Sequence, residues 1–238
     1  MSEQEQTDIT AEVLTSFSDS FENSNLIDTF SQIGEFAIDQ AIKNDMLRDM
    51  PIIGVLVSGY KTVVNVKDYY LARKVYRFLY NLKDTTPTER QKFSKKYCES
   101  NKEKTALSLL NILDQLNNGN LVPVICSLMK AVINEDITIY QFNRLIIALQ
   151  RTAYTDIVQL SKYEKPYDED GLSDALLASG LIYQSVIEGD NAKTGEIGSK
   201  FLISPNGYLL LKYGLCQKNT KENLRNIDIK IRSEWETF

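Results

Sequence analysis

The sequence contains no histidine, and this absence removes several kinds of chemistry at once. Histidine is the usual general base near neutral pH and the most common metal ligand. Zinc sites built with histidine, and Ser-His or Cys-His nucleophile pairs, are therefore excluded. Acid-base chemistry by carboxylates, lysine or tyrosine stays open, but no spacing in the sequence points to it. We therefore expect no enzyme activity, no metal and no cofactor.

Cysteine is also scarce. The chain has three cysteines, Cys98, Cys126 and Cys216, and no CxxC spacing. An odd and widely spaced set gives no disulfide framework and fits a reducing compartment. The first ten residues are polar and acidic, so we expect no signal peptide. Together these observations favour a cytoplasmic location.

The two charge signs are unevenly distributed along the chain. Residues 1–42 contain nine acidic residues and no lysine or arginine, whereas residues 61–104 contain twelve basic and five acidic residues. The first 23 residues also have few large apolar side chains, so we predict a flexible acidic tail over 1–23. A basic region can bind phosphates or anionic lipid, but solvated helix faces are the simpler interpretation.

Apolar residues at helical spacing dominate the chain from residue 24 to 163. They predict helices over residues 25–47, 51–66 and 67–83, followed by further amphipathic helices. Start signals support this pattern at three places, where a Ser or Thr precedes a Glu or Gln by three residues. These pairs are Thr86 with Glu89, Ser100 with Glu103, and Thr138 with Gln141. The sequence therefore predicts a helical domain over 24–163.

The pattern changes in the last third, over residues 164–238. A short helix, LSDALLAS, ends at Gly180 in the position after the C-cap. LIYQSVIEG and EIGSKFLIS alternate like the two strands of a hairpin, and Ser204 with Pro205 begins a final helix. The fold class is thus mainly α, a helical bundle followed by a small winged-helix-like α+β module. The helix before the hairpin carries Asp174 and no basic residue, so the module is poorly equipped for DNA, and we expect a protein-contact or structural winged domain.

The stretch GVLVSGYKT, residues 54–62, resembles a phosphate-binding loop with one letter misplaced. Gly54 and Gly59 have the required separation, but Tyr60 lies between the second glycine and Lys61. Bulky apolar residues fill the interior of the stretch, and Pro51 does not suit a central strand. We therefore predict a helix here rather than a nucleotide site.

This apolar helix and the basic helix after it are the candidate functional segments. The run 51–66 is too short to span a bilayer, so it is either a core helix or a segment that enters a membrane after a trigger. Residues 67–83 combine tyrosines with basic residues, which suits an anionic membrane surface, stacking on single-stranded bases, or packing at the edge of a core. The membrane or helix-packing candidates are Ile52, Ile53, Gly54, Leu56, Val57 and Ser58, and the candidates for anionic-surface binding are Lys67, Arg73, Lys74 and Arg77.

Several short motifs resemble those of a set of uncharacterised bacterial helical proteins. These proteins share an apolar "P-I-x-G" segment, a basic helix ending in F-L, and a winged-helix-like tail with "[LI]-[ST]-x-x-G". The matching residues are Pro51, Ile52, Gly54, Phe78, Leu79, Ile203, Ser204 and Gly207. The resemblance covers about residues 30–215 and implies a bacterial, cytosolic or membrane-peripheral protein without catalytic residues. A role in phage defence or on a mobile element is a hypothesis from the same resemblance.

Two functional hypotheses follow. The first is a non-enzymatic interaction or effector protein that has a protein partner and is membrane-active through residues 51–66. The second is a nucleic-acid-binding regulator that uses the winged module or the basic helix. The first is preferred, because the winged module offers few phosphate contacts. Homo-oligomerisation is compatible with either hypothesis.

Overall fold

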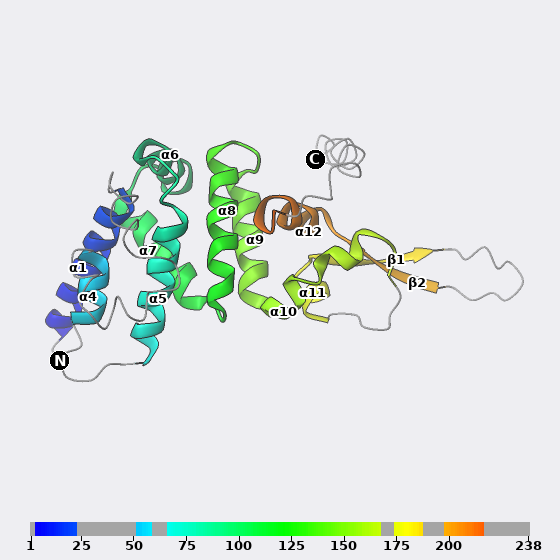
Figure 1. Ribbon diagram of the computed structural model, residues 1–238, viewed down its shortest axis with the longest axis horizontal. Coiled ribbons are helices and arrows are strands. Elements are labelled where there is room, and N and C mark those ends of the chain that lie inside the picture. Colours follow the sequence, from blue (N-terminus) through cyan, green and yellow to red (C-terminus); the bar gives the residue numbers. More distant parts are fainter. Residues whose placement is uncertain (1–2, 23–50, 59–65, 168–173, 188–197, 217–238) are drawn as a thin grey trace, which may run out of the picture. The chain divides into compact units, whose positions relative to one another are not determined.

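A computed structural model describes residues 3–22, 51–58, 66–167, 174–187 and 198–216 (Figure 1). Over these residues the protein is mainly helical, with a small two-stranded antiparallel sheet, so the mainly α fold class is confirmed. The chain divides into two compact units, Met1–Ile139 and Tyr140–Phe238. Each unit is described separately, with the element labels of Figure 1.

Unit 1 is built from helices. Its described elements are α1 (Glu3–Glu22), α4 (Pro51–Ser58), α5 (Val66–Asn81), α6 (Pro87–Cys98), α7 (Lys102–Gln115), a 3-10 turn η1 (Gly119–Leu121) and α8 (Val122–Ile133). Helix α5 contacts α4, α7 and α8, and α1 contacts α4, α6 and α7. Val75 and Phe78 on α5 are fully buried, as is Leu82 directly after the helix. The predicted helix over 25–47 lies outside the described residues.

The N-terminal segment, residues 3–22, is a helix that contributes to the core of unit 1, where the sequence pattern predicted a flexible tail. Phe17 and Phe21 are buried one helical turn apart, and both rings stack on Phe78 of α5 with centroids 6.2 and 6.3 Å away. The overall composition of the segment is polar, as in a disordered chain. Two aromatic residues at i and i+4 nevertheless form an apolar face on the helix, which the overall composition does not show.

Local start signals place α6 and α7. Thr86 accepts a hydrogen bond from the Glu89 N–H, and the Glu89 carboxylate accepts one from the Thr86 N–H, so the predicted capping box is confirmed. The second predicted box is wrong by one residue. Ser100 has a left-handed backbone, φ 64°, and Asn101 caps α7 by accepting from the Lys104 N–H.

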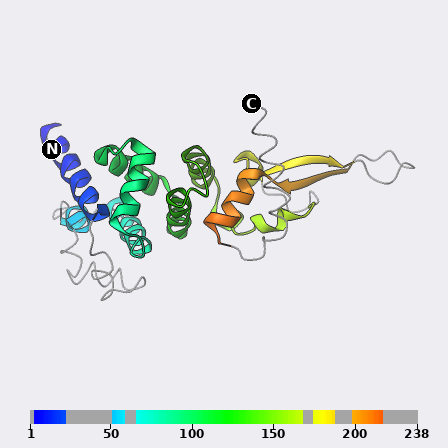
Figure 2. The same cartoon turned by 90° about the horizontal axis from the view of Figure 1, so that it is seen from above.

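Unit 2 combines short helices with the hairpin. Its described elements are α9 (Ile139–Arg151, whose first residue belongs to unit 1), α10 (Tyr154–Ile157), a 3-10 helix η2 (Leu160–Glu164), α11 (Asp174–Ala178), β1 (Ile182–Ile187), β2 (Gly198–Ile203), α12 (Pro205–Leu209) and a π-turn η3 (Leu210–Gly214). The strands pair antiparallel with Ile182 opposite Ile203, which confirms the predicted hairpin (Figure 2). Tyr167 adds a bridge to Phe201 on the other edge of β2. The connection between the two strands, 188–197, lies outside the described residues.

The end of the hairpin and the start of α12 are joined closely. Gly180 follows α11 with φ +73°, as predicted for a helix terminator, and the Leu181 N–H donates to Leu176 O. The Ser204 hydroxyl caps α12 by accepting from the Gly207 N–H and donates to Gly180 O. A Cβ on Gly207 would lie 2.2 Å from Leu181 O, so only glycine fits there.

The sequence placed the domain boundary at residues 163 and 164, where a polar loop follows the last long helix. In the structure the division falls 24 residues earlier, at residues 139 and 140. Helices α9 and α10 therefore belong with the hairpin, and α10 and β1 both contact α11.

Candidate functional site

Helix α4 holds the apolar candidates, and the structure places its described side chains in the core of unit 1. Ile52, Ile53 and Leu56 are buried, and the helix contacts α1 and α5. Gly54, Val57 and Ser58 lie on the same helix, but their side chains are outside the described part of the structure. Within the described ranges, no helix is long and apolar enough to cross a bilayer. In this conformation α4 is a core helix.

The same stretch carries the resemblance to a phosphate-binding loop. Residues 51–58 form a helix that includes Gly54, where such a loop would need a turn of irregular backbone. The helix predicted for this stretch is therefore confirmed as far as Ser58. Gly59, Lys61 and Thr62 lie outside the described residues.

Lys74 is the first of the basic candidates, and it contacts the C-terminal end of α7. Its ammonium donates to Asp114 O at 3.0 Å and to Leu116 O at 2.7 Å. The last carbonyls of a helix have no intrahelical partner and carry the negative end of the helix dipole, so a cation stabilises them. Burial lowers the pKa of Lys74, and the nearby Asp114 partly opposes that shift. Lys74 therefore has a structural role in unit 1.

Arg77 contacts the turn between α7 and α8; of the remaining two candidates, Arg73 is half-buried like Arg77, and Lys67 is exposed. The Arg77 guanidinium donates to Gly119 O at 3.1 Å and to the Asn120 side-chain oxygen at 3.0 Å, and so holds the turn before α8. Arg73 lies over the Tyr69 ring, 5.9 Å from its centroid. The structure thus brings Lys74 and Arg77 together at the connection from α7 to α8 instead of gathering all four on one free face.

A buried arginine that the sequence analysis did not single out, Arg90, joins three elements. Its side chain is 1% exposed and donates to Phe21 O at the end of α1 and to both Thr85 oxygens in the turn before α6. Burial lowers the pKa of Arg90, while Glu89 and Glu22 act in the opposite direction. Its position on a helix that also buries Phe93 was the available signal, because residues three apart share a helix face.

Groups that could perform chemistry are few in the described part of the chain. No cluster of three or more cysteine, aspartate or glutamate side chains there could hold a metal ion. Cys126 is fully buried, and burial raises the pKa of its thiol well above the usual range. Burial also raises the pKa of Glu164 and, together with Glu164 itself, that of Tyr208. Burial is the main cause of each pKa shift. The shifts therefore reflect the packing of these side chains and do not indicate an acid-base pair whose pKa values are set by neighbouring charges.

A shallow pocket of about 130 Å³ lies beside the capping box of α6. It is lined by Asp84, Thr85, Glu89, Lys130, Ile133 and Asn134. The Glu89 carboxylate already accepts the Thr86 N–H and hydroxyl, so its hydrogen-bonding capacity is partly used within the protein. The pocket is also small beside ordinary ligand sites, which measure roughly 300–1,000 Å³.

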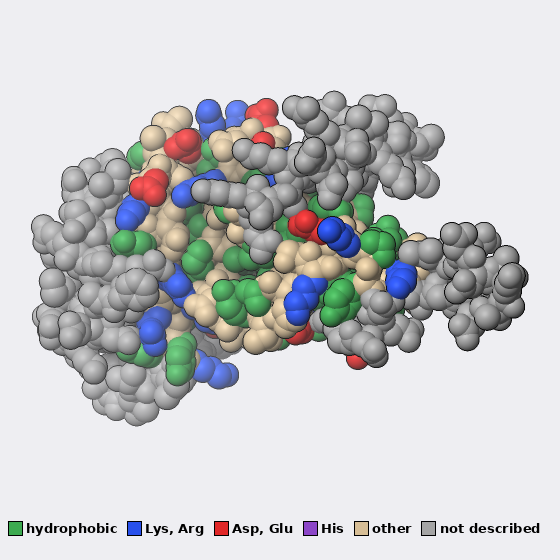
Figure 3. All heavy atoms as spheres, turned by 45° about the vertical axis from the view of Figure 1, so that its right-hand side comes forward, with side chains coloured by type: hydrophobic (Ala, Val, Ile, Leu, Met, Phe, Trp, Pro, Cys, Tyr) green, Lys and Arg blue, Asp and Glu red, His purple; other side chains and the backbone are tan. Residues whose placement is uncertain are grey.

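Exposed apolar side chains are concentrated in unit 2. Among the described residues, seven large hydrophobic side chains are exposed, and five of them belong to this unit although it is the shorter one. The five are Tyr140, Ile147, Val158, Leu177 and Tyr183, and the two in unit 1 are Tyr70 and Leu107. On the face shown in Figure 3, hydrophobic side chains lie next to lysine and arginine side chains instead of forming one continuous apolar area.

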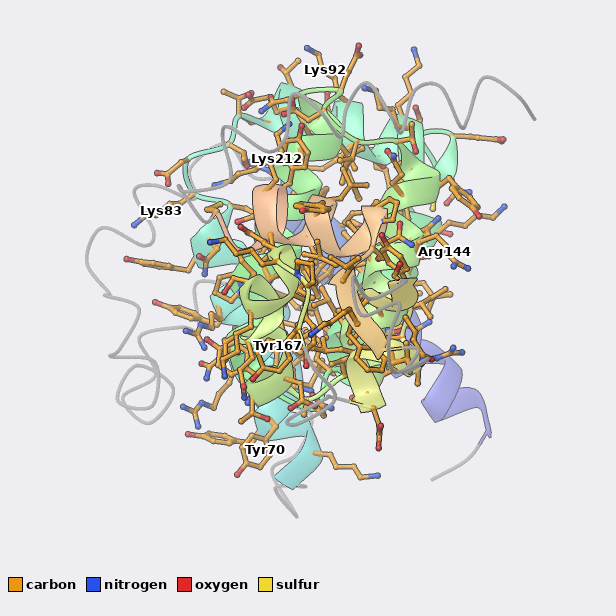
Figure 4. The ribbon with its side chains drawn as sticks, turned by 90° about the vertical axis from the view of Figure 1, so that its right-hand side faces the viewer. Tyr70, Lys83, Lys92, Arg144, Tyr167 and Lys212 are labelled. Carbon is orange, nitrogen blue, oxygen red and sulfur yellow. The ribbon has the colours of Figure 1, made fainter. Side chains whose placement is uncertain are left out.

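The most regular of these surfaces is the outer face of α9. Phe142, Leu145 and Leu149 are fully buried on one side of the helix. The opposite side carries exposed residues at i, i+4, i+7 and i+11, which align along a helix. We call them the α9 stripe: Tyr140, Arg144, Ile147 and Arg151. Figure 4 shows Arg144 at the periphery of the molecule.

The comparisons with known proteins add no relative to this picture: no protein-family model, no curated protein and no solved structure matches the chain.

Proposed function

We propose that the protein is a non-enzymatic interaction protein that contacts a protein partner through unit 2. The observation that supports this proposal is the concentration of exposed apolar side chains in that unit. Large apolar side chains that stay in water mark contact surfaces when they gather on one part of a molecule. Aromatic residues and arginine are enriched at protein interfaces, and unit 2 exposes both.

Unit 2 is best interpreted as a winged-helix-like module. The bridging residue Tyr167, helix α11 and the β1–β2 hairpin follow one another in the order of such a module. Over residues 174–178, α11 carries Asp174 and no basic residue. Phosphate contacts dominate DNA affinity, so this helix is poorly suited to a DNA groove, and its exposed Leu177 suits a protein contact instead.

The membrane hypothesis for residues 51–66 needs a rearrangement of unit 1. Ile52, Ile53 and Leu56 would have to leave their positions against α1 and α5 before they could contact lipid. Each such side chain contributes about 1.5–3 kcal/mol when it is buried, so the release would be costly without a trigger. We therefore propose a protein contact rather than a membrane contact for the protein in this conformation.

The test uses two matched double variants of the full chain. Tyr183→Ser with Ile147→Ser alters unit 2, where these residues are 46% and 44% exposed. Tyr70→Ser with Leu107→Ser alters unit 1, where they are 54% and 46% exposed, so both pairs remove one tyrosine and one aliphatic side chain. Tagged chains are recovered from the cells that encode the protein, and co-purifying proteins are quantified and confirmed by reciprocal capture.

We expect a partner that the unit 1 variant retains and the unit 2 variant loses by at least tenfold. Equal retention by both variants would contradict a contact through unit 2. If the partner is no longer recovered after nuclease treatment, the result would support the nucleic-acid hypothesis instead. If the protein is recovered only with membranes, the result would support the membrane hypothesis for α4.

A further inference from the structure

We infer that the α9 stripe binds an acidic amphipathic helix of a partner protein. The inference rests on the proposed function and deepens it, because it assigns one surface within unit 2 and the chemistry of its occupant. It starts from the composition of α9, which carries two arginines and no acidic residue.

The stripe alternates apolar and cationic side chains along one line. Tyr140 is 61% and Ile147 is 44% exposed, and Arg144 and Arg151 are exposed between and beyond them. Within the described residues neither arginine has an ion-pair or hydrogen-bond partner for its guanidinium, in contrast to Lys74, Arg77 and Arg90. Two uncompensated cations beside two exposed apolar residues are complementary to a surface that carries carboxylates around an apolar centre.

The spacing of the stripe suggests the shape of that surface. Arg144 and Arg151 are seven residues apart, which is about 10 Å along the helix axis. Ile147 lies between them, three residues from one and four from the other. A partner helix with carboxylates at i and i+7, and an apolar residue between them, would face all three side chains. Tyr140 would extend the contact by one turn.

Two other occupants fit the stripe less well. Proteins that bind DNA through its backbone commonly contact about six to ten phosphates, whereas the stripe offers two cations with an isoleucine between them. A helix that lies in a membrane surface separates its charged face from its apolar face. On α9 the apolar face is buried in the protein, and the exposed face mixes apolar and charged side chains.

The experiment places a photo-crosslinking amino acid at Asn143, which is exposed next to the stripe, in the full chain in the cells that encode it. A second chain carries it at Tyr183 on β1. The crosslinked segments are mapped by mass spectrometry. The Asn143 chain is also tested with Arg144→Glu plus Arg151→Glu and, as a matched control, with Lys92→Glu plus Lys95→Glu, which reverses two exposed cations on α6.

We expect the Asn143 position to crosslink to a helical segment of another protein that has acidic residues seven apart. The α9 charge reversal should lower the crosslinking yield at least tenfold, and the α6 reversal should change it less than twofold. When the two acidic residues of the partner are replaced by lysine, the chain with the α9 reversal should regain its crosslinking yield. A crosslink to a second copy of the chain, to nucleic acid, or to a segment without paired acids would overturn the inference. Crosslinking at Tyr183 alone would overturn it while leaving the proposed function intact, and crosslinking at neither position would count against both.

Discussion

Helices α5 and α9 are both amphipathic and carry tyrosine and basic residues, but their cations have different roles. On α5, Lys74 and Arg77 donate to backbone carbonyls of the connection from α7 to α8. On α9, Arg144 and Arg151 remain on the surface. A basic aromatic helix in a sequence therefore does not by itself indicate a binding surface. Its basic side chains can instead donate hydrogen bonds to backbone carbonyls at the ends of other helices in the same protein.

The contrast extends to what holds each unit together. In unit 1, cations stabilise helix ends that lie far apart in sequence, and Arg90 is the most buried of them. In unit 2, the described contacts at the hairpin end depend on close backbone approach around Ser204 and Gly207. The following predictions test this difference, from the largest expected effect to the smallest.

Replacing the buried cation of unit 1 should have the largest effect. Arg90→Met leaves Phe21 O and Thr85 O without their donor in a buried site, which we expect to lower the free energy of unfolding by about 4 kcal/mol. Arg151→Met, on the α9 stripe, should change it by less than about 0.5 kcal/mol. Chemical denaturation followed by circular dichroism measures both. Similar losses for the two variants would remove the contrast between the units.

Adding a side chain at Gly207 in unit 2 should have the next largest effect on the free energy of unfolding. The new Cβ of Gly207→Ala would clash with Leu181 O at 2.2 Å and with Ile203 Cγ1 at 2.6 Å, so we expect a loss of about 3 kcal/mol. In Gly119→Ala the nearest atom is an Arg77 nitrogen at 4.0 Å, and the change should stay below about 1 kcal/mol. Hydrogen exchange should show the loss of protection in β1 and β2. A stable, fully protected Gly207→Ala chain would show that α12 can move away without cost.

Removing the cation from α5 should cost less than removing Arg90, because Lys74 is only partly buried. Lys74→Met deletes two hydrogen bonds to the end of α7, and we expect a loss of about 1–2 kcal/mol. Arg144→Met on α9 deletes none within the described residues and serves as the matched control. Thermal melts of the two variants separate these cases, and an Arg144→Met loss equal to that of Lys74→Met would mean that α9 also has a structural cation.

The smallest effect concerns the capping box of α6. Hydrogen bonds from the Thr86 N–H and then the Thr86 hydroxyl lower the pKa of Glu89 below its ordinary value of 4.5. The stabilisation is therefore complete above pH 4.5 and is lost as the pH falls through the lowered folded-state pKa. In Glu89→Gln, which can still form the box, the loss of stability between pH 5 and 3 should be slightly smaller than in the parent chain. Unchanged pH dependence would assign the acid sensitivity to other carboxylates.

Signals confined to a few neighbouring residues predicted much of this structure. The capping box at Thr86, the terminator at Gly180, the hairpin strands and the Ser204 cap need only local sequence. Two features that the sequence pattern did not show depend on distant partners, whereas the misplaced start of α7 was a local error of one residue. Phe17 and Phe21 become core residues because Phe78 stacks on them, and Arg90 becomes buried because α1 ends beside it. The α9 stripe was missed for the opposite reason, since no local signal tells an exposed isoleucine from a core one.

The placement of α1 also sets an order of assembly during translation. Phe21 and Arg90 are 69 residues apart, and Glu22 and Lys102, which form an ion pair, are 80 apart. At the usual rates of synthesis, the ribosome needs roughly 4–16 s to add 80 residues. Helix α1 therefore leaves the ribosome well before Arg90 and Lys102, and its contacts with them form only after those residues have been made.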